Sequence, residues 1–265
     1  MYTYLQKSSL FPNGNKDLST VDTQNVINII ATKFFLKNWR FGVYKQNFDE
    51  IAYLKERCKI FLKYCYPSVI RNLKVSDKWF LFVTDDFIEI VKNELGELDS
   101  RVIICDLSTR SFCEEINSYI LNGFVPIVTR IDNDDSLSID YQVMVGKIGK
   151  FLSLNNDYGI IIFPNGIQHC ISKNETNVMI YNDTHTFSIF YNSLIDLQDK
   201  KVPWIFGFPH TQMYLTNYKL FICNTSLPMW SENLNGANQY NAEVKHSLKL
   251  DNNQQILSEL FPFYK

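Results

Sequence analysis

Long apolar runs, an excess of one charge and a secretory leader are all missing from this sequence. No apolar stretch approaches the roughly 20 residues that span a bilayer, and residues 1–20 lack the basic start and apolar centre of a signal peptide. The net charge is only −2 and the isoelectric point is about 6.1, so no basic field attracts nucleic acid. These absences predict a globular protein that stays in the cytoplasm and acts on small substrates.

Paired cysteines are also missing. The six cysteines are scattered and include no C-x-x-C pair, which gives no pattern for a zinc site or a disulfide framework. What the chain has instead is apolar material, since 46% of its 265 residues are hydrophobic. That share is enough for one large core, with room for a smaller subdomain.

The first half of the chain alternates between strand-like and helix-like stretches. Short apolar runs with the length of buried strands occur at residues 26–32, 79–83, 101–105 and 124–131. Apolar residues at helical spacing lie between them, at residues 49–66, 87–95 and 111–121. Strands that are apolar throughout, with helices between them, predict an α/β fold with a mostly parallel sheet covered on both faces.

The second half predicts further strands without a break between domains. Residues 159–171 have the pattern of a hairpin around Pro164-Asn165-Gly166, and we expect this half to elaborate the sheet and cover the site. We expect a loosely held extension at residues 1–25, a single domain at 26–250 and an apolar tail at 251–265. The tail either packs on the chain's own surface or forms a dimer contact or membrane-surface dock.

An acidic segment follows the strand at residues 124–131. Asp132, Asp134 and Asp135 stand together there, and such carboxylates repel each other unless a cation or hydrogen bonds offset their charge. A divalent cation with oxygen ligands does this; alternatively, Asp135 or Ser136 caps a following helix over residues 137–152. On the repulsion argument, Asp134→Asn should retain the fold.

Two other acidic motifs fit the segment less well. An EF-hand calcium loop needs glycine where Leu137 stands and glutamate where Val143 stands. A haloacid-dehalogenase-type phosphatase uses an Asp-x-Asp with a later Ser or Thr, which Asp132, Asp134 and Ser136 match. That family carries the motif on its first strand, whereas here at least three expected strands precede it.

The segment TRIDNDDSL at residues 129–137 resembles the Asp-x-Asp segment of GT-A-fold glycosyltransferases. It is closely similar to the TR-L-DNDD-L form of a family of bacterial rhamnosyltransferases. Other segments resemble that family in the same order, at residues 31–36, 53–69, 79–83, 190–196, 209–211 and 228–241. Two departures from the family pattern are Lys33 in place of arginine and Asp196 in place of glutamate.

This resemblance implies a GT-A (Rossmann-like) fold and a metal-dependent glycosyltransferase. Such an enzyme moves a sugar, here rhamnose or another, from a nucleotide-sugar donor to a glycan or lipid-linked glycan acceptor, with inversion, in surface polysaccharide synthesis. We expect the chain in the cytoplasm or at the inner face of the membrane, and the apolar tail gives the alternatives of a homodimer or peripheral association with the membrane. The alternatives are the phosphatase and a non-catalytic carbohydrate-binding module of the same fold.

The resemblance also implies roles for individual residues. Asp134 is expected to bind Mn²⁺ or Mg²⁺ directly, with His210 as a further ligand. Asp196 is expected to be the catalytic base, with Glu232 and Asp183 as rivals. The donor-binding residues are Thr32, Lys33, Arg57, Asp85, Arg130 and Asp132; for Asp85 the alternative is a helix N-cap. For the two arginines the alternative is a simple ion pair with a neighbouring carboxylate.

Overall fold

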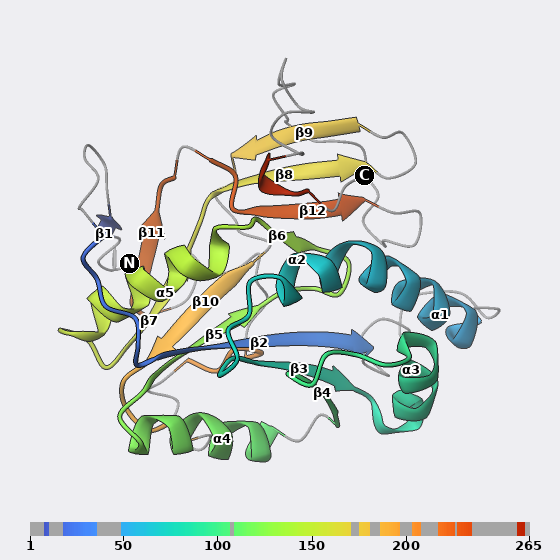
Figure 1. Ribbon diagram of the computed structural model, residues 1–265, viewed down its shortest axis with the longest axis horizontal. Helices are drawn as coiled ribbons and strands as arrows, with labels where there is room; N and C mark the ends of the chain where they lie inside the picture. The colour runs from blue at the N-terminus through green and yellow to red at the C-terminus, as the bar shows by residue number, and fades with distance from the viewer. Residues whose placement is uncertain are drawn as a thin grey trace.

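The computed structural model in Figure 1 describes residues 8–10, 18–35, 49–106, 109–170, 175–180, 186–196, 203–207, 217–225, 227–234 and 259–262. Within these residues, two sheets and a set of flanking helices form an α/β fold. The predicted α/β class, with a mostly parallel sheet flanked by helices, is confirmed.

The larger sheet has eight strands among the described residues, in the order β1-β11-β7-β10-β5-β2-β3-β4. Neighbouring strands are parallel except at β10, which runs antiparallel to both β5 and β7. The strands are β1 (Ser8–Leu10), β2 (Val26–Phe35), β3 (Lys78–Val83), β4 (Val102–Cys105), β5 (Val125–Arg130), β7 (Tyr158–Ile162), β10 (Phe187–Tyr191) and β11 (Leu220–Cys223). The four apolar runs predicted as strands in the first half are β2 to β5.

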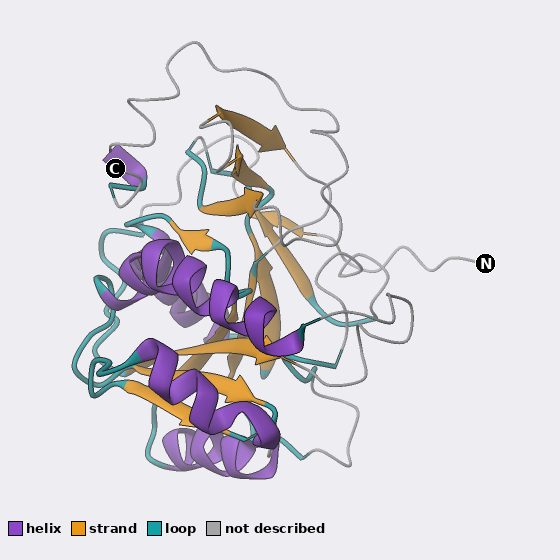
Figure 2. Ribbon diagram, turned by 90° about the vertical axis from the view of Figure 1, so that its right-hand side faces the viewer, coloured by secondary structure: helices purple, strands orange, loops and turns teal. Residues whose placement is uncertain are grey.

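Helices cover both faces of this sheet (Figures 1 and 2). One core joins Ile30 and Phe34 of β2 to α1, α3 and α5, and a second joins Ile29 and Ala31 to α4. Alternate residues of β2 therefore enter opposite cores, as the pleat of a strand requires. The helices are α1 (Glu50–Ile60), which continues through a π-helical turn (Phe61–Cys65) into α2 (Tyr66–Ile70), then a 3₁₀ turn (Asp85–Phe87), α3 (Ile88–Leu95), α4 (Thr109–Leu121) and α5 (Tyr141–Ser153).

A smaller sheet lies above the larger one in Figure 1 and belongs mainly to the C-terminal half. Its order is β6-β12-β8-β9, from β6 (Ser136–Leu137), β12 (Trp230–Leu234), β8 (Asn165–Cys170) and β9 (Glu175–Ile180). Strand β12 pairs with β6 directly after the acidic segment. The C-terminal half thus adjoins the candidate site.

The predicted hairpin at residues 159–171 is wrong. Strand β7 lies in the larger sheet and β8 in the smaller one, and β8 pairs with β9 and β12. Gly166 lies within β8 rather than in a turn, and a Cβ there would collide with the ring of Trp230 on β12. Close packing between neighbouring strands, and not a tight turn, requires this glycine.

The predicted helix at residues 137–152 begins later than expected. Ser136 and Leu137 form β6, and α5 starts at Tyr141 with Asp140 as its N-cap residue. The suggestion that Asp135 or Ser136 caps this helix is therefore wrong, because Ser136 and Leu137 pair with β12 and the helix begins only after Asp140.

Both expected terminal segments contribute to the folded chain. Ser8–Leu10 of the expected extension forms the edge strand β1 beside β11. Leu260 and Phe261 of the tail are buried, and the Ile139 amide donates to the Leu260 carbonyl at 3.1 Å. These contacts hold the described part of the tail to the chain's own surface, as one of its two readings predicted. None of the helices in the described residues combines the length and apolar character that crossing a bilayer requires.

Candidate functional site

The acidic segment leaves the sheet at the carboxyl end of β5, where ligands of open α/β sheets bind. Backbone and side-chain bonds fasten it to β2: the Ile131 amide donates to the Ala31 carbonyl at 3.2 Å, and Asn133 Nδ2 donates to the Phe34 carbonyl at 3.1 Å. The segment therefore has a fixed path across the edge formed by the two central strands.

Arg57, from α1, binds the carboxylate of Asp134. Its Nη2 donates to Asp134 Oδ1 at 2.6 Å and its Nη1 to Asp134 Oδ2, while Nη2 also donates to Asn133 Oδ1. Only 4% of Arg57 and 6% of Asp134 is exposed. Burial by itself lowers the pKa of Arg57, but the charge and hydrogen bond of Asp134 outweigh it and raise the pKa above its usual value.

This ion pair gives two expected site residues a structural partner. The alternative that Arg57 pairs with a neighbouring carboxylate is confirmed. Both oxygens of Asp134, the expected metal ligand, accept bonds from the guanidinium. The metal-binding role of Asp134 stays a prediction, and a metal ion would have to compete with Arg57 for these two oxygens.

Lys33 and Arg130 gather on the opposite face of the sheet, over Phe206. The Lys33 Nζ lies 4.1 Å and the Arg130 Cζ 5.8 Å from the centre of the Phe206 ring. Asp132 lies beside them, with 3.9 Å between its Oδ1 and Arg130 Nη2. Burial and the charge of Arg130 lower the pKa of Lys33 to about 8, although Asp132 opposes this. Two cations and one carboxylate thus lie together over the Phe206 ring.

Two carboxylates, Asp135 and Glu232, lie close together where the acidic segment meets the smaller sheet. Ser231 pairs with Ser136, so Glu232 stands next in the register to Asp135. Burial, and then the charges of Asp134, Asp132 and Glu232, raise the pKa of Asp135 well above its usual value. Glu232 accepts a hydrogen bond from Gln168 Nε2 at 2.8 Å. Glu232, a rival for the catalytic base, therefore lies beside the acidic segment.

Other expected site residues lie elsewhere. Thr32 is fully buried, and its hydroxyl accepts a bond from Trp79 Nε1 at 3.0 Å, so it belongs to the core. Asp85 is exposed at the start of the 3₁₀ turn after β3. His210 and Asp183 lie outside the described residues.

Asp196, the expected catalytic base, follows a strand that runs the opposite way to β5. Phe187 at the start of β10 pairs with Arg130 at the end of β5, so the antiparallel β10 ends beside the amino end of β5, away from the acidic segment. The preceding residue is fixed to α4, since the Ile195 amide donates to Asn117 Oδ1 at 2.7 Å and Asn117 Nδ2 donates to the Ile195 carbonyl at 2.9 Å. The structure therefore places Asp196 beside α4 and does not bring it to the acidic segment.

The described residues do not fit the divalent metal site that the sequence led us to expect. Nowhere in the described ranges do three Asp, Glu, His or Cys side chains lie close enough to hold a metal ion. Asp134 is bound by Arg57, and Asp132 is left as one carboxylate beside two cations. A divalent ion held by only one or two protein carboxylates needs substrate phosphates to complete its ligand shell, and Arg57 already binds one of the two candidate carboxylates.

Sequence reasoning missed Phe206, which has no motif around it and acts only through its position under the two cations.

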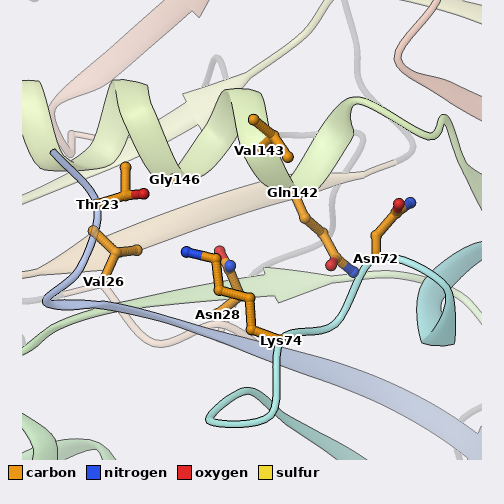
Figure 3. Close-up of a pocket in the computed structure, with 8 residues that line it drawn as sticks. All are labelled: Thr23, Val26, Asn28, Asn72, Lys74, Gln142, Val143 and Gly146. Carbon is orange, nitrogen blue, oxygen red and sulfur yellow. The ribbon is translucent and has the colours of Figure 1, made fainter. Parts of the chain in front are cut away.

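Sequence reasoning also missed a cavity of about 60 Å³ at the amino end of β2 (Figure 3). Buried oxygens of Asn28 and Gln142 have no hydrogen-bond partner among the described residues, and both side chains line the cavity. The space suits a few ordered waters and lies at the other end of β2 from the acidic segment.

Comparisons with known proteins give a weak likeness. No protein-family model and no curated protein matches the chain. Among solved structures, it is similar to 4-diphosphocytidyl-2C-methyl-D-erythritol synthase from Anaerococcus prevotii, at 13% identity over 90% of this chain and 96% of that one, with a TM-score of 0.39. It is also similar to TarS 1-349 from S. aureus in complex with UDP-GlcNAc, at 11% identity over 82% of this chain and 61% of that one, with a TM-score of 0.39. These values assign neither a family nor an activity to this chain.

Proposed function

We propose that this chain is a glycosyltransferase that uses a nucleotide-diphosphate sugar as donor and a glycan hydroxyl as acceptor. The observation that carries the proposal is the pair Lys33 and Arg130 at the carboxyl ends of the adjacent strands β2 and β5. Ligands of parallel sheets bind at these ends, and paired cations there suit a diphosphate. The ordered resemblance from residue 26 to 241 supports the same reading.

The reaction exchanges one bond at the sugar for another. The bond between the anomeric carbon and the diphosphate oxygen breaks, and its electron pair stays on the leaving diphosphate. A bond forms between the anomeric carbon and the acceptor oxygen, whose proton passes to a carboxylate. Lys33 and Arg130 would hold the diphosphate and offset the charge that grows on it.

We propose Glu232 ahead of Asp196 as the carboxylate that takes the proton. Glu232 lies beside the acidic segment across the β6–β12 pair. Asp196 follows β10, which ends beside the amino end of β5 and so leads away from the acidic segment. The inverting course, the rhamnosyl donor, the role in surface polysaccharide synthesis and action in the cytoplasm or on the inner face of the membrane stay predictions from the sequence.

Incubating the purified chain with a panel of nucleotide sugars and candidate glycan acceptors, with and without Mn²⁺, tests the proposal. We expect acceptor-dependent release of a nucleoside diphosphate from at least one donor. A phosphatase would instead release phosphate from simple phosphomonoesters without any nucleotide. A carbohydrate-binding module would bind glycans without releasing nucleotide, and either of these results would replace the proposed function.

A further inference from the structure

We propose that this chain binds the donor diphosphate through Lys33 and Arg130 without a bridging divalent ion, because Arg57 occupies the carboxylate that would hold the ion. The inference rests on the proposed function and concerns how the leaving group is stabilised. It contradicts the metal dependence that the resemblance implies.

The first step is the commitment of Asp134. Its two oxygens face two nitrogens of one guanidinium in a bidentate pair. A metal ion that took Asp134 as a ligand would have to displace Arg57, whose side chain is only 5% exposed. A displaced guanidinium would be left buried without its counter-charge, which is strongly unfavourable.

Asn133 makes the pair harder to open. Its Oδ1 accepts from Arg57 Nη2, and its Nδ2 donates to the Phe34 carbonyl at the end of β2. From the other side, Asn233 Nδ2 of β12 donates to the Asp134 carbonyl oxygen. Both neighbouring strands therefore hold the backbone and side chain of this segment in the paired arrangement.

The second step is the charge that remains beside the segment. Lys33 and Arg130 supply two positive charges and Asp132 one negative charge. A divalent cation placed at Asp132 would be repelled by both neighbours, whereas an anion would be attracted. On the Phe206 side of the segment the two cations therefore favour a phosphate, whereas Asp135 and Glu232 lie on the side of the smaller sheet.

The third step is the geometry of the cations. Arg130 pairs in register with Ala31, so Lys33 lies two residues further along β2 on the same face. The ring of Phe206 lies under both side chains and attracts each of them. A guanidinium binds two phosphate oxygens as a fork, and an ammonium binds as a point charge. Together they match the two phosphates of a diphosphate, and they would stabilise the electron pair that the leaving oxygen receives.

Calorimetric titration with UDP, GDP and dTDP, each in EDTA and in excess Mn²⁺, tests this inference on the full chain. We expect at least one nucleotide to bind, with an affinity that changes less than about threefold between the two conditions. Lys33→Met and Arg130→Gln should each weaken binding in EDTA by about 10- to 100-fold, as loss of one charge-assisted hydrogen bond predicts. Lys33→Arg, which keeps the charge, should bind within a few-fold of the wild type.

Matched controls come from exposed cations away from the site. Lys59→Met on α1 and Arg110→Gln on α4 remove the same charges from largely exposed side chains and should leave nucleotide affinity unchanged. Binding that requires Mn²⁺ would overturn the inference and leave the proposed function standing. Binding in EDTA that both site variants leave intact would overturn the role of Lys33 and Arg130. Failure to bind any nucleotide in either condition would overturn the proposed function itself.

Discussion

Breaking the Arg57–Asp134 pair should destabilise the fold, and Asp134→Asn is the sharpest way to break it. The substitution keeps the size of the side chain and removes its charge. Arg57, with 4% of its surface exposed, would then be a buried cation that has lost its bidentate counter-ion. Removing one partner of a buried ion pair typically costs about 3–5 kcal/mol. Repulsion among the aspartates, which led us to expect an intact fold, is smaller because the guanidinium already neutralises Asp134.

The size of this effect makes it measurable by thermal unfolding. In a chain of this length each kcal/mol shifts the melting temperature by roughly 2–4 °C, so we expect Asp134→Asn to lower it by about 6–20 °C. Asp132→Asn is the matched control, since its side chain is 30% exposed and lies 3.9 Å from Arg130 without a short bidentate contact, so we expect a smaller fall in melting temperature.

The double variant Arg57→Met with Asp134→Asn completes the test. It removes the unpaired charge, and so it should be more stable than Asp134→Asn alone, with a coupling of about 0.5–3 kcal/mol or more. An unchanged melting temperature in Asp134→Asn would refute the reasoning, and it would restore the view that this carboxylate is free to bind a metal.

Three further predictions concern the base, the tail and Lys33. Glu232→Gln should lower turnover by about 10²- to 10⁴-fold with donor affinity nearly unchanged, whereas Asp196→Asn should leave turnover near normal. Steady-state kinetics and calorimetry on both variants measure these effects. A large loss of turnover in Asp196→Asn with normal turnover in Glu232→Gln would contradict this assignment. Phe261→Ala should lower the free energy of unfolding by about 3–5 kcal/mol, because this fully buried ring holds the tail to the domain. Chemical denaturation should show a lowered midpoint and gel filtration an unchanged elution volume. A changed elution volume would favour a dimer contact. Nucleotide affinity should fall as pH rises through about 8, where Lys33 loses its proton. Folding stability should rise with pH between about 8 and the usual lysine pKa near 10.4, because the unfolded chain binds this proton more tightly than the folded chain does. A Lys33→Arg variant that kept the same pH dependence of binding would contradict the assignment.

Local pattern was a good guide wherever one segment's own residues decide its structure. The apolar runs of β2, β3, β4 and β5 and the apolar spacing of α4 appear in the structure close to their predicted bounds. A strand buried on both faces must be apolar throughout, and a helix that covers a sheet must repeat its apolar residues every three or four positions. Both rules act within a few neighbouring residues, and so they can be read from sequence.

Local pattern failed where a distant segment competed for the same residues. The Pro164-Asn165-Gly166 turn did not form a hairpin, because β8 pairs with β9 and β12 instead of β7. Residues 136–137 entered a strand because β12 supplied a partner, which delayed the start of α5. In each case the local signal was real, and pairing with a segment far along the chain outweighed it.

The sequence by itself determined the class of fold, the order of the central strands along the chain and the presence of charged residues at their carboxyl ends. Only the tertiary structure decided which charges meet. Arg57 and Asp134 are 77 positions apart, and Phe206 reaches Lys33 and Arg130 from a segment without any motif. Electrostatic energy depends on distance in space and on burial, not on spacing along the chain. The acidic segment alone therefore resembled a metal site, until the fold placed a guanidinium against it.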